Sequence, residues 1–229
     1  MTTSLPTNFT LPTGEFITLD GERYYAIYDV DRMDPFLISL ASDRDHWMFV
    51  ASNGGLTAGR VSPETALFPY VTVDNIYDST GKTGCKTLVR VGEGADCLLW
   101  EPFNTEKGSD YSICRNLYRN HLGNKLVLEE VNNDLELCFR YSWASSERYG
   151  FVRSCSLHNR AAAPVKLEVL DGMQNILPAG TPRHTQTDSS YLVDAYKLNQ
   201  LDAGTGLAFY TLFSGISDRA EPKESLRAN

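Results

Sequence analysis

The stretch that decides the fold reads Leu135-Glu-Leu-Cys-Phe-Arg-Tyr-Ser-Trp143. Apolar side chains alternate with more polar ones, and a period of two places every apolar side chain on one face of an extended strand. The residues 125–131 directly before it predict a partner strand. Asn132 and Asn133 lie between the two, and they predict a tight hairpin because Asn tolerates positive φ. The face from Leu135 to Trp143 is therefore expected to fill the core between two sheets.

More strands are expected on both sides of this hairpin. Those that follow it directly, over Phe151–Leu157 and Val165–Leu170, should join it in one large antiparallel sheet. The other expected strands are Glu15–Asp20, Arg23–Val30, Phe36–Ala41, His46–Ala51, Lys86–Val91, Cys97–Trp100, Tyr111–Leu117, Tyr191–Lys197 and Gly206–Phe213. No segment shows a 3.6-residue apolar stripe of helical length. Many short strands separated by turn residues predict an all-β fold built as a large antiparallel sandwich.

The chain is expected to divide into an arm, one domain and a tail. Residues 1–14 are rich in Thr and Pro and predict a loosely attached N-terminal arm. Residues 15–217 form the predicted sandwich, a size at which all-β chains often make a single domain. Residues 218–229 are polar and predict the start of a linker to a missing C-terminal region.

Composition disfavours several classes of function. The 229 residues carry a net charge of −8, which repels nucleic acid and anionic lipid. The N-terminus has neither the basic nor the apolar region of a secretory signal, and no apolar run is long enough to span a membrane. The five cysteines are odd in number and widely spaced. They predict reduced core thiols in a cytoplasmic protein.

The usual motifs of catalysis and cofactor binding are missing from the sequence. The segment Gly81–Thr87 invites comparison with a phosphate-binding loop, but Ile76 stands where that motif requires its first Gly. The four histidines have no metal-ligand spacing and no Cys-x-x-Cys is present, so neither a metal nor a cofactor is expected. The Gly-x-Ser-x-Gly elbow of hydrolases is also absent.

A carbohydrate site would need paired carboxylates or exposed aromatic rings. The acidic pairs Glu129-Glu130 and Asp43/Asp45 are interpreted as solvated strand ends rather than catalytic acids. Three aromatic residues are candidates for stacking on a sugar: Trp100, Tyr70 and Trp143, although the alternation favours a core position for Trp143. Loops carry sites more often than core strands do. The candidate sugar-binding rim consists of Arg60, Trp100, Arg183 and His184.

A series of motifs then suggests a family. In chain order they are Ser52-Asn53-Gly54-Gly55, Gly59-Arg60, Phe68-Pro69-Tyr70, Leu99-Trp100-Glu101-Pro102, Cys114-Arg115, and the run from Phe151 to Arg160 that continues over Pro164–Val169. In this order they resemble the N-terminal β-sandwich domain, or super-sandwich, of glycoside hydrolase family 94. That family comprises the cellobiose and chitobiose phosphorylases and was formerly glycosyltransferase family 36. The resemblance runs from about Phe36 onward. Where the family has Arg-His-Gly, this chain has Arg115-Asn116-Leu117, so neither phosphorolysis nor a particular sugar is implied.

The resemblance carries expectations about fold and function. In such enzymes the sandwich resembles the galactose mutarotase superfold, and the catalytic acid belongs to an (α/α)6 barrel that follows it. The resemblance therefore implies a non-catalytic N-terminal domain of a sugar phosphorylase-like or glycoside hydrolase-like enzyme. The implied partners are the (α/α)6 catalytic domain of the same polypeptide, an oligosaccharide at the rim of its site, and a second copy in a homodimer. Nucleic acid, membrane and cofactor are not among them.

Three other functions stay open from the residues alone. A mutarotase-like epimerase needs a His acid and a Glu base on a concave sheet face, for which His158 or His184 with Glu168 or Glu136 are candidates. A carbohydrate-binding module would depend on Trp100, and an interaction scaffold on a large exposed face. The epimerase would lose activity on His158→Ala or His184→Ala, and the binding module would lose affinity on Trp100→Ala. The domain hypothesis predicts a reading frame that continues past Asn229 into a long helical region.

Overall fold

Antiparallel sheets dominate the computed structural model, which describes residues 11–94, 97–104, 110–178, 181–212 and 225–228. Strands hold 50% of these described residues and helices 14%. This confirms the predicted all-β class and its sandwich type of architecture.

The larger sheet has six strands in the order β1-β2-β8-β9-β10-β11. They are β1 (Thr13–Leu19), β2 (Glu22–Tyr28), β8 (Ile113–Asn120), β9 (Lys125–Asn132), β10 (Leu137–Ser146) and β11 (Gly150–Asn159). All neighbours are antiparallel. Asp20 and Gly21 connect β1 to β2 with φ of 50° and 80°, the left-handed values that a two-residue hairpin turn requires.

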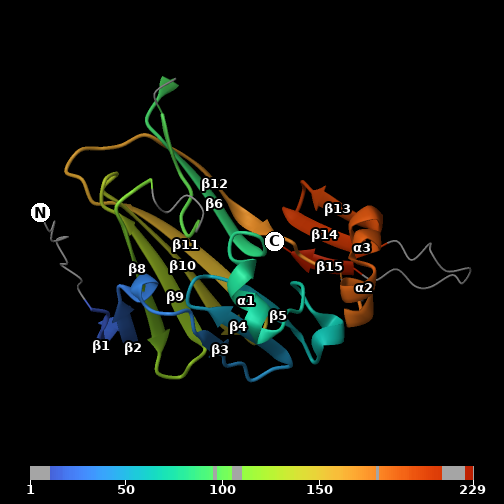
Figure 1. The fold of residues 1–229 in the computed structure, drawn as a ribbon. Helices are drawn as coiled ribbons and strands as arrows, with labels where there is room; N and C mark the ends of the chain where they lie inside the picture. The colour runs from blue at the N-terminus through green and yellow to red at the C-terminus, as the bar shows by residue number, and fades with distance from the viewer. Residues whose placement is uncertain (1–10, 95–96, 105–109, 179–180, 213–224, 229) are drawn as a thin grey trace, which may run out of the picture.

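Two three-stranded sheets face the larger one across the core (Figure 1). One contains β3 (Leu37–Leu40), β4 (His46–Ala51) and β5 (Leu56–Arg60), and the other has β6 (Gly84–Val91) between β12 (Leu167–Gln174) and β7 (Leu98–Trp100). Short helical turns connect them: η2 (Pro63–Thr65), α1 (Val73–Ile76) and η3 (Tyr77–Ser79), while η1 (Val30–Arg32) follows β2.

A fourth sheet, also of three strands, lies beside the sandwich. Its strands are β13 (Lys197–Asp202), β14 (Leu207–Leu212) and β15 (Ser225–Ala228), and the helices α2 (Arg183–Asp188) and α3 (Ser190–Tyr196) lie against it at the right of Figure 1. Val193 of α3 packs with Ala66 and Leu177 in a separate small cluster. This cluster fastens the helices to the sandwich.

The core is where the alternating stretch predicted it. Leu137, Phe139, Tyr141 and Trp143 of β10 are at most 3% exposed and belong to the main hydrophobic cluster, together with residues of both facing sheets. Each such side chain contributes roughly 1.5–3 kcal/mol when it is fully buried. The hairpin turn differs from the prediction, because Asn132 is still part of β9 and the turn comprises residues 133–136. The Oδ1 atom of Asn132 accepts the amides of Asp134 and Leu135, at 3.2 and 3.0 Å, so Leu135 lies in the turn.

Two other predictions about the chain are wrong. The strand after β11 does not join the larger sheet, since β12 pairs with β6 instead. Between them, the side chain of Asn159 binds the backbone of Ala161 and Ala163 and turns the chain away. The predicted strand over residues 191–197 is mainly helix α3, whose two turns are too short to show a helical stripe.

The predicted arm and linker also contain strands. β1 begins at Thr13, inside the predicted arm, while residues 1–10 lie outside the described part. In the predicted tail, Ser225–Ala228 pair with β14 as β15, and residues 218–224 and 229 are not described. Backbone hydrogen bonds alone can pair such a short strand. Its sequence therefore shows no apolar alternation that would have predicted it.

Candidate functional site

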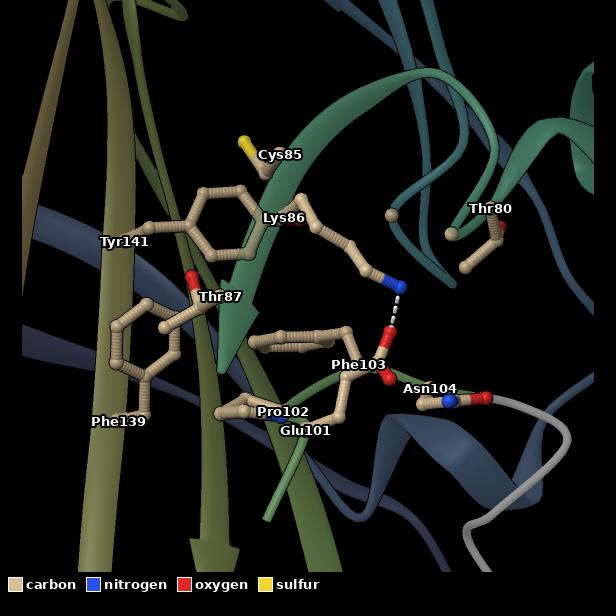
Figure 2. Close-up of a pocket in the computed structure, with 12 residues that line it drawn as sticks. Thr80, Cys85, Lys86, Thr87, Glu101, Pro102, Phe103, Asn104, Phe139 and Tyr141 are labelled. Atoms are coloured by element: carbon tan, nitrogen blue, oxygen red, sulfur yellow. Dashed lines mark hydrogen bonds and ion pairs between the residues drawn. The ribbon is translucent and has the colours of Figure 1, made fainter. Parts of the chain in front are cut away.

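A small cavity opens between β6 and the segment that follows β7 (Figure 2). Its walls come from the turn at Gly54, from Thr80 and Gly81, from β6, and from residues 101–104, with Phe139 and Tyr141 of β10 behind. The cavity has a volume of about 20 Å³, which holds about one water molecule. A sugar ring does not fit into it as it stands.

An ion pair crosses the mouth of this cavity. Figure 2 shows the Nζ atom of Lys86 directed at a carboxylate oxygen of Glu101, and the two groups form a salt bridge. The Glu101 side chain is only 10% exposed and that of Lys86 is 36% exposed. Because each charge is neutralised by the other, neither is a free acid, base or anion ligand.

A second ion pair lies deeper, beside a second water-sized cavity. Glu130 of β9 is 1% exposed. Its carboxylate accepts the indole Nε1 of Trp100 at 2.9 Å, the amide of Phe103 at 2.8 Å and the Nε of Arg115 at 2.8 Å. The guanidinium of Arg115 also lies over the Phe103 ring and donates to the Asn104 carbonyl. All partners of this carboxylate are structural, and together they fix the 100–104 segment to the larger sheet.

The neighbouring Glu129 is buried on the opposite face of the same strand. Its carboxylate accepts hydrogen bonds from Asn116, Tyr118 and Arg140. Burial by itself raises the pKa of Glu129, but these three donors outweigh it and hold the pKa below its usual value. Burial and the same carboxylate raise the pKa of Tyr118. The carboxylate is therefore ionised and fully engaged. Both glutamates were expected to be solvated strand ends, and the structure shows that interpretation to be wrong.

Arg153 of β11 connects the two layers of the sandwich at their β11–β12 edge. Its terminal nitrogens donate to both carboxylate oxygens of Asp171 on β12, at 2.7 and 2.8 Å, and its Nε lies 2.9 Å from the Sγ of Cys85. Burial raises the pKa of Cys85 to about 11. This thiol is therefore protonated near neutral pH and is a poor nucleophile.

The candidate rim residues do not all gather in one place. Trp100 is 2% exposed with its N–H bound to Glu130, so the expectation of an exposed sugar-stacking ring is corrected: Trp100 is part of the core. Arg60 ends β5 and is exposed. Arg183 and His184 begin helix α2 rather than lying in a loop. The amide of Arg183 donates to Glu64 of η2 at 2.7 Å, which brings α2 close to the segment that follows Arg60.

The residues considered for an epimerase are scattered. His158 is exposed on β11, and Glu168 of β12 pairs with Arg90. Glu136 lies in the β9–β10 turn with a φ of 53°. None of them lines either of the two cavities described above. Neither of these two cavities therefore brings a His and a Glu from this set together to face a sugar.

Of the aromatic residues considered for stacking, Tyr70 alone is accessible. Trp143 is 2% exposed, as the alternation predicted. Tyr70 is half-buried and packs edge-on against Trp47, which also contacts Phe49. Neither Trp47 nor Phe49 was among the predicted stacking residues, although their alternation with Met48 and Val50 places them on the outer face of β4.

The residues of the family-like motifs make structural contacts between elements of the sandwich. Asn53 accepts the amide of Gly55 and donates to the Tyr77 carbonyl. A Cβ atom on Gly55 would lie 2.1 Å from the Ile76 carbonyl oxygen, so only glycine fits. Arg115 and Arg153 form the buried and the edge ion pairs described above. These motifs therefore specify how the sandwich is assembled.

In the part of the chain that the structure describes, no group of three or more His, Cys, Asp or Glu side chains is arranged to hold a metal ion. The five cysteines are free; Cys138 is buried and Cys155 is exposed, so the expected core position is wrong for Cys155. None of the described helices combines the length and apolarity of a transmembrane segment.

Comparisons with known proteins add no relative. No protein-family model matches the chain, and no curated protein matches it. The function is therefore inferred from the residues and the geometry above.

Proposed function

We propose that this chain is the non-catalytic sandwich domain of a cytoplasmic carbohydrate-active enzyme of the sugar phosphorylase-like or glycoside hydrolase-like type. Its role is to pack on an (α/α)6 catalytic domain of the same polypeptide and to shape the sugar site of that domain. The ordered motifs that resemble family 94 and the sandwich architecture support the carbohydrate assignment.

One observation carries the non-catalytic part of the proposal. The buried carboxylates of Glu129 and Glu130, and the Glu101 carboxylate at the mouth of the cavity, are each held by donors of the protein itself. Glycoside cleavage requires two carboxyl groups placed across a sugar ring. The two cavities beside Glu101 and Glu130 hold about one water each, so these acids have no place for a substrate.

The C-terminal third of the described chain supports a missing partner. Large apolar side chains are exposed on β12, α3 and β13, among them Leu170 at 69%, Tyr191 at 68% and Leu201 at 70%. We propose that these side chains belong to one covered surface, since a contiguous exposed apolar patch marks a site where another chain segment or domain binds. An (α/α)6 domain, alone or in a homodimer, is the proposed cover.

Two measurements test this function. The purified chain should neither phosphorolyse nor hydrolyse cellobiose or chitobiose, and polarimetry should detect no acceleration of glucose mutarotation. The natural reading frame should continue past Asn229 into a long helical region. A stop codon at that point, or mutarotation that disappears on His158→Ala, would overturn the proposal in favour of an independent protein or an epimerase.

A further inference from the structure

Strand β11 is an outer strand of the larger sheet, and one side of its backbone has no partner strand among the described residues. It pairs with β10 over its whole length, and the amide of Arg160, directly after β11, donates to the Glu136 carbonyl at 2.8 Å in the same register. Hydrogen-bonded pairs alternate along an antiparallel ladder, so the even-numbered residues of β11 bond to β10. The N–H and C=O groups of the odd-numbered residues therefore point away from the sheet. These residues include Phe151, Arg153, Cys155 and Leu157.

The sandwich is also open along this side. Val169 of β12 is 51% exposed, although it lies opposite Val89, which is fully buried in the core. Met173, on the same face of β12, is 38% exposed. On β11, Cys155 is exposed although it lies opposite the buried Tyr141. Side chains that point toward the core are thus accessible to water at the β11–β12 edge, and covering them would stabilise an association.

Strand β11 lacks the features that usually protect an edge strand. Natural edges are often short or bulged, or they carry Pro or Lys. In contrast, β11 has ten residues in an unbroken register, with neither Pro nor Lys among them. Its one arginine, Arg153, is held by Asp171, and the Arg153 side chain is only 9% exposed. The other outer strand of the sheet, β1, has seven residues. The longer β11 is therefore the better edge for pairing with another strand.

The sequence of β11 fits a second copy of itself. In an antiparallel pair centred on Ser154, all four outward-pointing residues fall in hydrogen-bonded pairs. Phe151 lies opposite Leu157 of the partner subunit, and Arg153 lies opposite Cys155 of the partner subunit. The first pair extends the core, against which Phe151 and Leu157 already pack. No charges of like sign meet in this register.

The neighbouring symmetric registers fit less well. A pair centred on Arg153 would place two arginines directly opposite each other, and like charges in that position are destabilising. A pair centred on Cys155 would place the Phe151 ring opposite the polar Asn159 of the partner subunit. The register centred on Ser154 avoids both contacts, and its central pair consists of two small serines.

The same symmetry covers the open side of the sandwich. The two-fold axis runs perpendicular to the sheet, so the inward faces of both copies lie on the same side. The two β12 strands then approach each other, and the exposed Val169 and Met173 of one copy are covered by the other copy. An unrelated strand would satisfy the backbone of β11 but would bring no second β12, which favours a second copy as the occupant.

We propose that β11 pairs with β11 of a second copy of this chain in an antiparallel, two-fold symmetric interface centred on Ser154. The two larger sheets then form one continuous sheet, and the outward-pointing residues of both copies satisfy each other's backbone groups. Such an interface is isologous and closed, so it produces dimers and not fibres. The inference goes beyond the proposed function, because a sandwich domain of any activity can pair in this way.

Sedimentation equilibrium of the full chain over a dilution series measures the dimer. The parent chain should follow a monomer–dimer equilibrium with a measurable Kd. Cys155→Pro removes an N–H that β10 does not use, so the sheet itself tolerates it. The Kd should weaken at least about tenfold, since each copy loses one hydrogen bond of the interface. Cys155→Ala keeps the N–H, is the matched control and should leave the Kd unchanged.

Disulfide trapping tests the register. In a non-hydrogen-bonded pair the Cα atoms lie about 4.5 Å apart, a separation that a disulfide can span. In the Cys155→Ala background, Ser154→Cys should give a disulfide-linked dimer on mild oxidation. Ser156→Cys, on the same exposed face of β11, is the control. It should not cross-link, because in this register Ser156 lies opposite Val152 of the partner subunit.

The outcomes decide the inference without deciding the proposed function. A chain that sediments as a monomer throughout the series overturns the interface, and so does an unchanged Kd in Cys155→Pro with circular dichroism that matches the parent chain. If Cys155→Pro fails to fold, the trapping experiment supplies the test: equal cross-linking of Ser154→Cys and Ser156→Cys, or none in either, contradicts the interface. The proposed function fails separately, through the reading frame or through turnover by the isolated chain.

Discussion

The indole of Trp100 donates its N–H to Glu130 over 2.9 Å, and both side chains are at most 2% exposed. This hydrogen bond joins β7 in one layer of the sandwich to β9 in the other. The same carboxylate holds Arg115 and the Phe103 amide. The buried ion pair of Arg115 and Glu130 lies within the larger sheet, and its carboxylate links that sheet to β7 and the segment after it.

Glu130→Ala should destabilise the fold by about 3–5 kcal/mol, because it leaves the Arg115 guanidinium buried without its counter-charge. Urea unfolding followed by circular dichroism measures the change. The matched control is Glu168→Ala. It also removes the glutamate of a Glu–Arg ion pair on a strand, but the Glu168 side chain is 62% exposed. That variant should change stability by less than about 1 kcal/mol. Equal losses in the two variants would contradict a structural role for Glu130.

Glu129 should make the free energy of unfolding depend on pH in the acidic range. Its pKa in the folded state lies below the ordinary value of 4.5, so its ionised form contributes stability that is present above about pH 4.5. That stability is lost as the pH falls through the folded pKa. The difference in unfolding free energy between the parent chain and Glu129→Gln should therefore shrink between pH 5 and pH 3 (about the range over which such a carboxyl titrates).

Urea titrations across that pH range provide the measurement. Glu147→Gln is the control, since the Glu147 side chain is 70% exposed and should give a difference close to zero throughout. A Glu129→Gln difference that stays constant with pH would show that the carboxylate does not titrate in this window.

The positions of these carboxylates show what the sequence allows. In β9, Leu126, Leu128 and Glu130 share one parity, so the alternation itself places Glu130 on the core face. The pair Glu129-Glu130 was interpreted as solvated because charged side chains usually face water. Arg115 lies directly opposite Glu130 on the neighbouring strand β8. Trp100, by contrast, donates to Glu130 from β7 in the other layer, and no local pattern pairs β7 with β9.

Local alternation also predicted most strands but not their partners. The register of β10 with β9 and β11 follows from short turns. The departure of β12 toward β6 depends on contacts between residues about 80 positions apart, such as Glu168 with Arg90. The contact between Trp47 and Tyr70 was missed for a related reason: the two rings meet only after the chain has folded back over β5.

Arg153 should hold β12 against the larger sheet. Replacement by Lys removes the two-pronged contact with Asp171, because an ammonium group cannot reproduce the planar fork. Amide hydrogen exchange in residues 167–174 should accelerate in Arg153→Lys, by roughly tenfold, while residues 125–132 of β9 keep their rates. Arg90→Lys is the control. Arg90 forms an ion pair with Glu168, which lies on β12 like Asp171, but this pair is exposed. Unchanged exchange in β12 would mean that its pairing with β6 suffices.

Gly55 should tolerate no side chain. In Gly55→Ala the Cβ atom would meet the Ile76 carbonyl oxygen at 2.1 Å and the Ser79 Oγ at 2.8 Å, and the first of these is backbone that cannot rotate away. Separation of the 52–55 turn from α1 should cost about 1–3 kcal/mol, measured as a lower urea midpoint. Gly172→Ala is the matched control, because nothing lies within 4 Å of its Cβ and alanine suits a strand slightly better than glycine. Equal stability of the two variants would show that the turn adjusts freely. A selective loss in Gly55→Ala would establish that the Ser52–Gly55 motif is required for packing against α1.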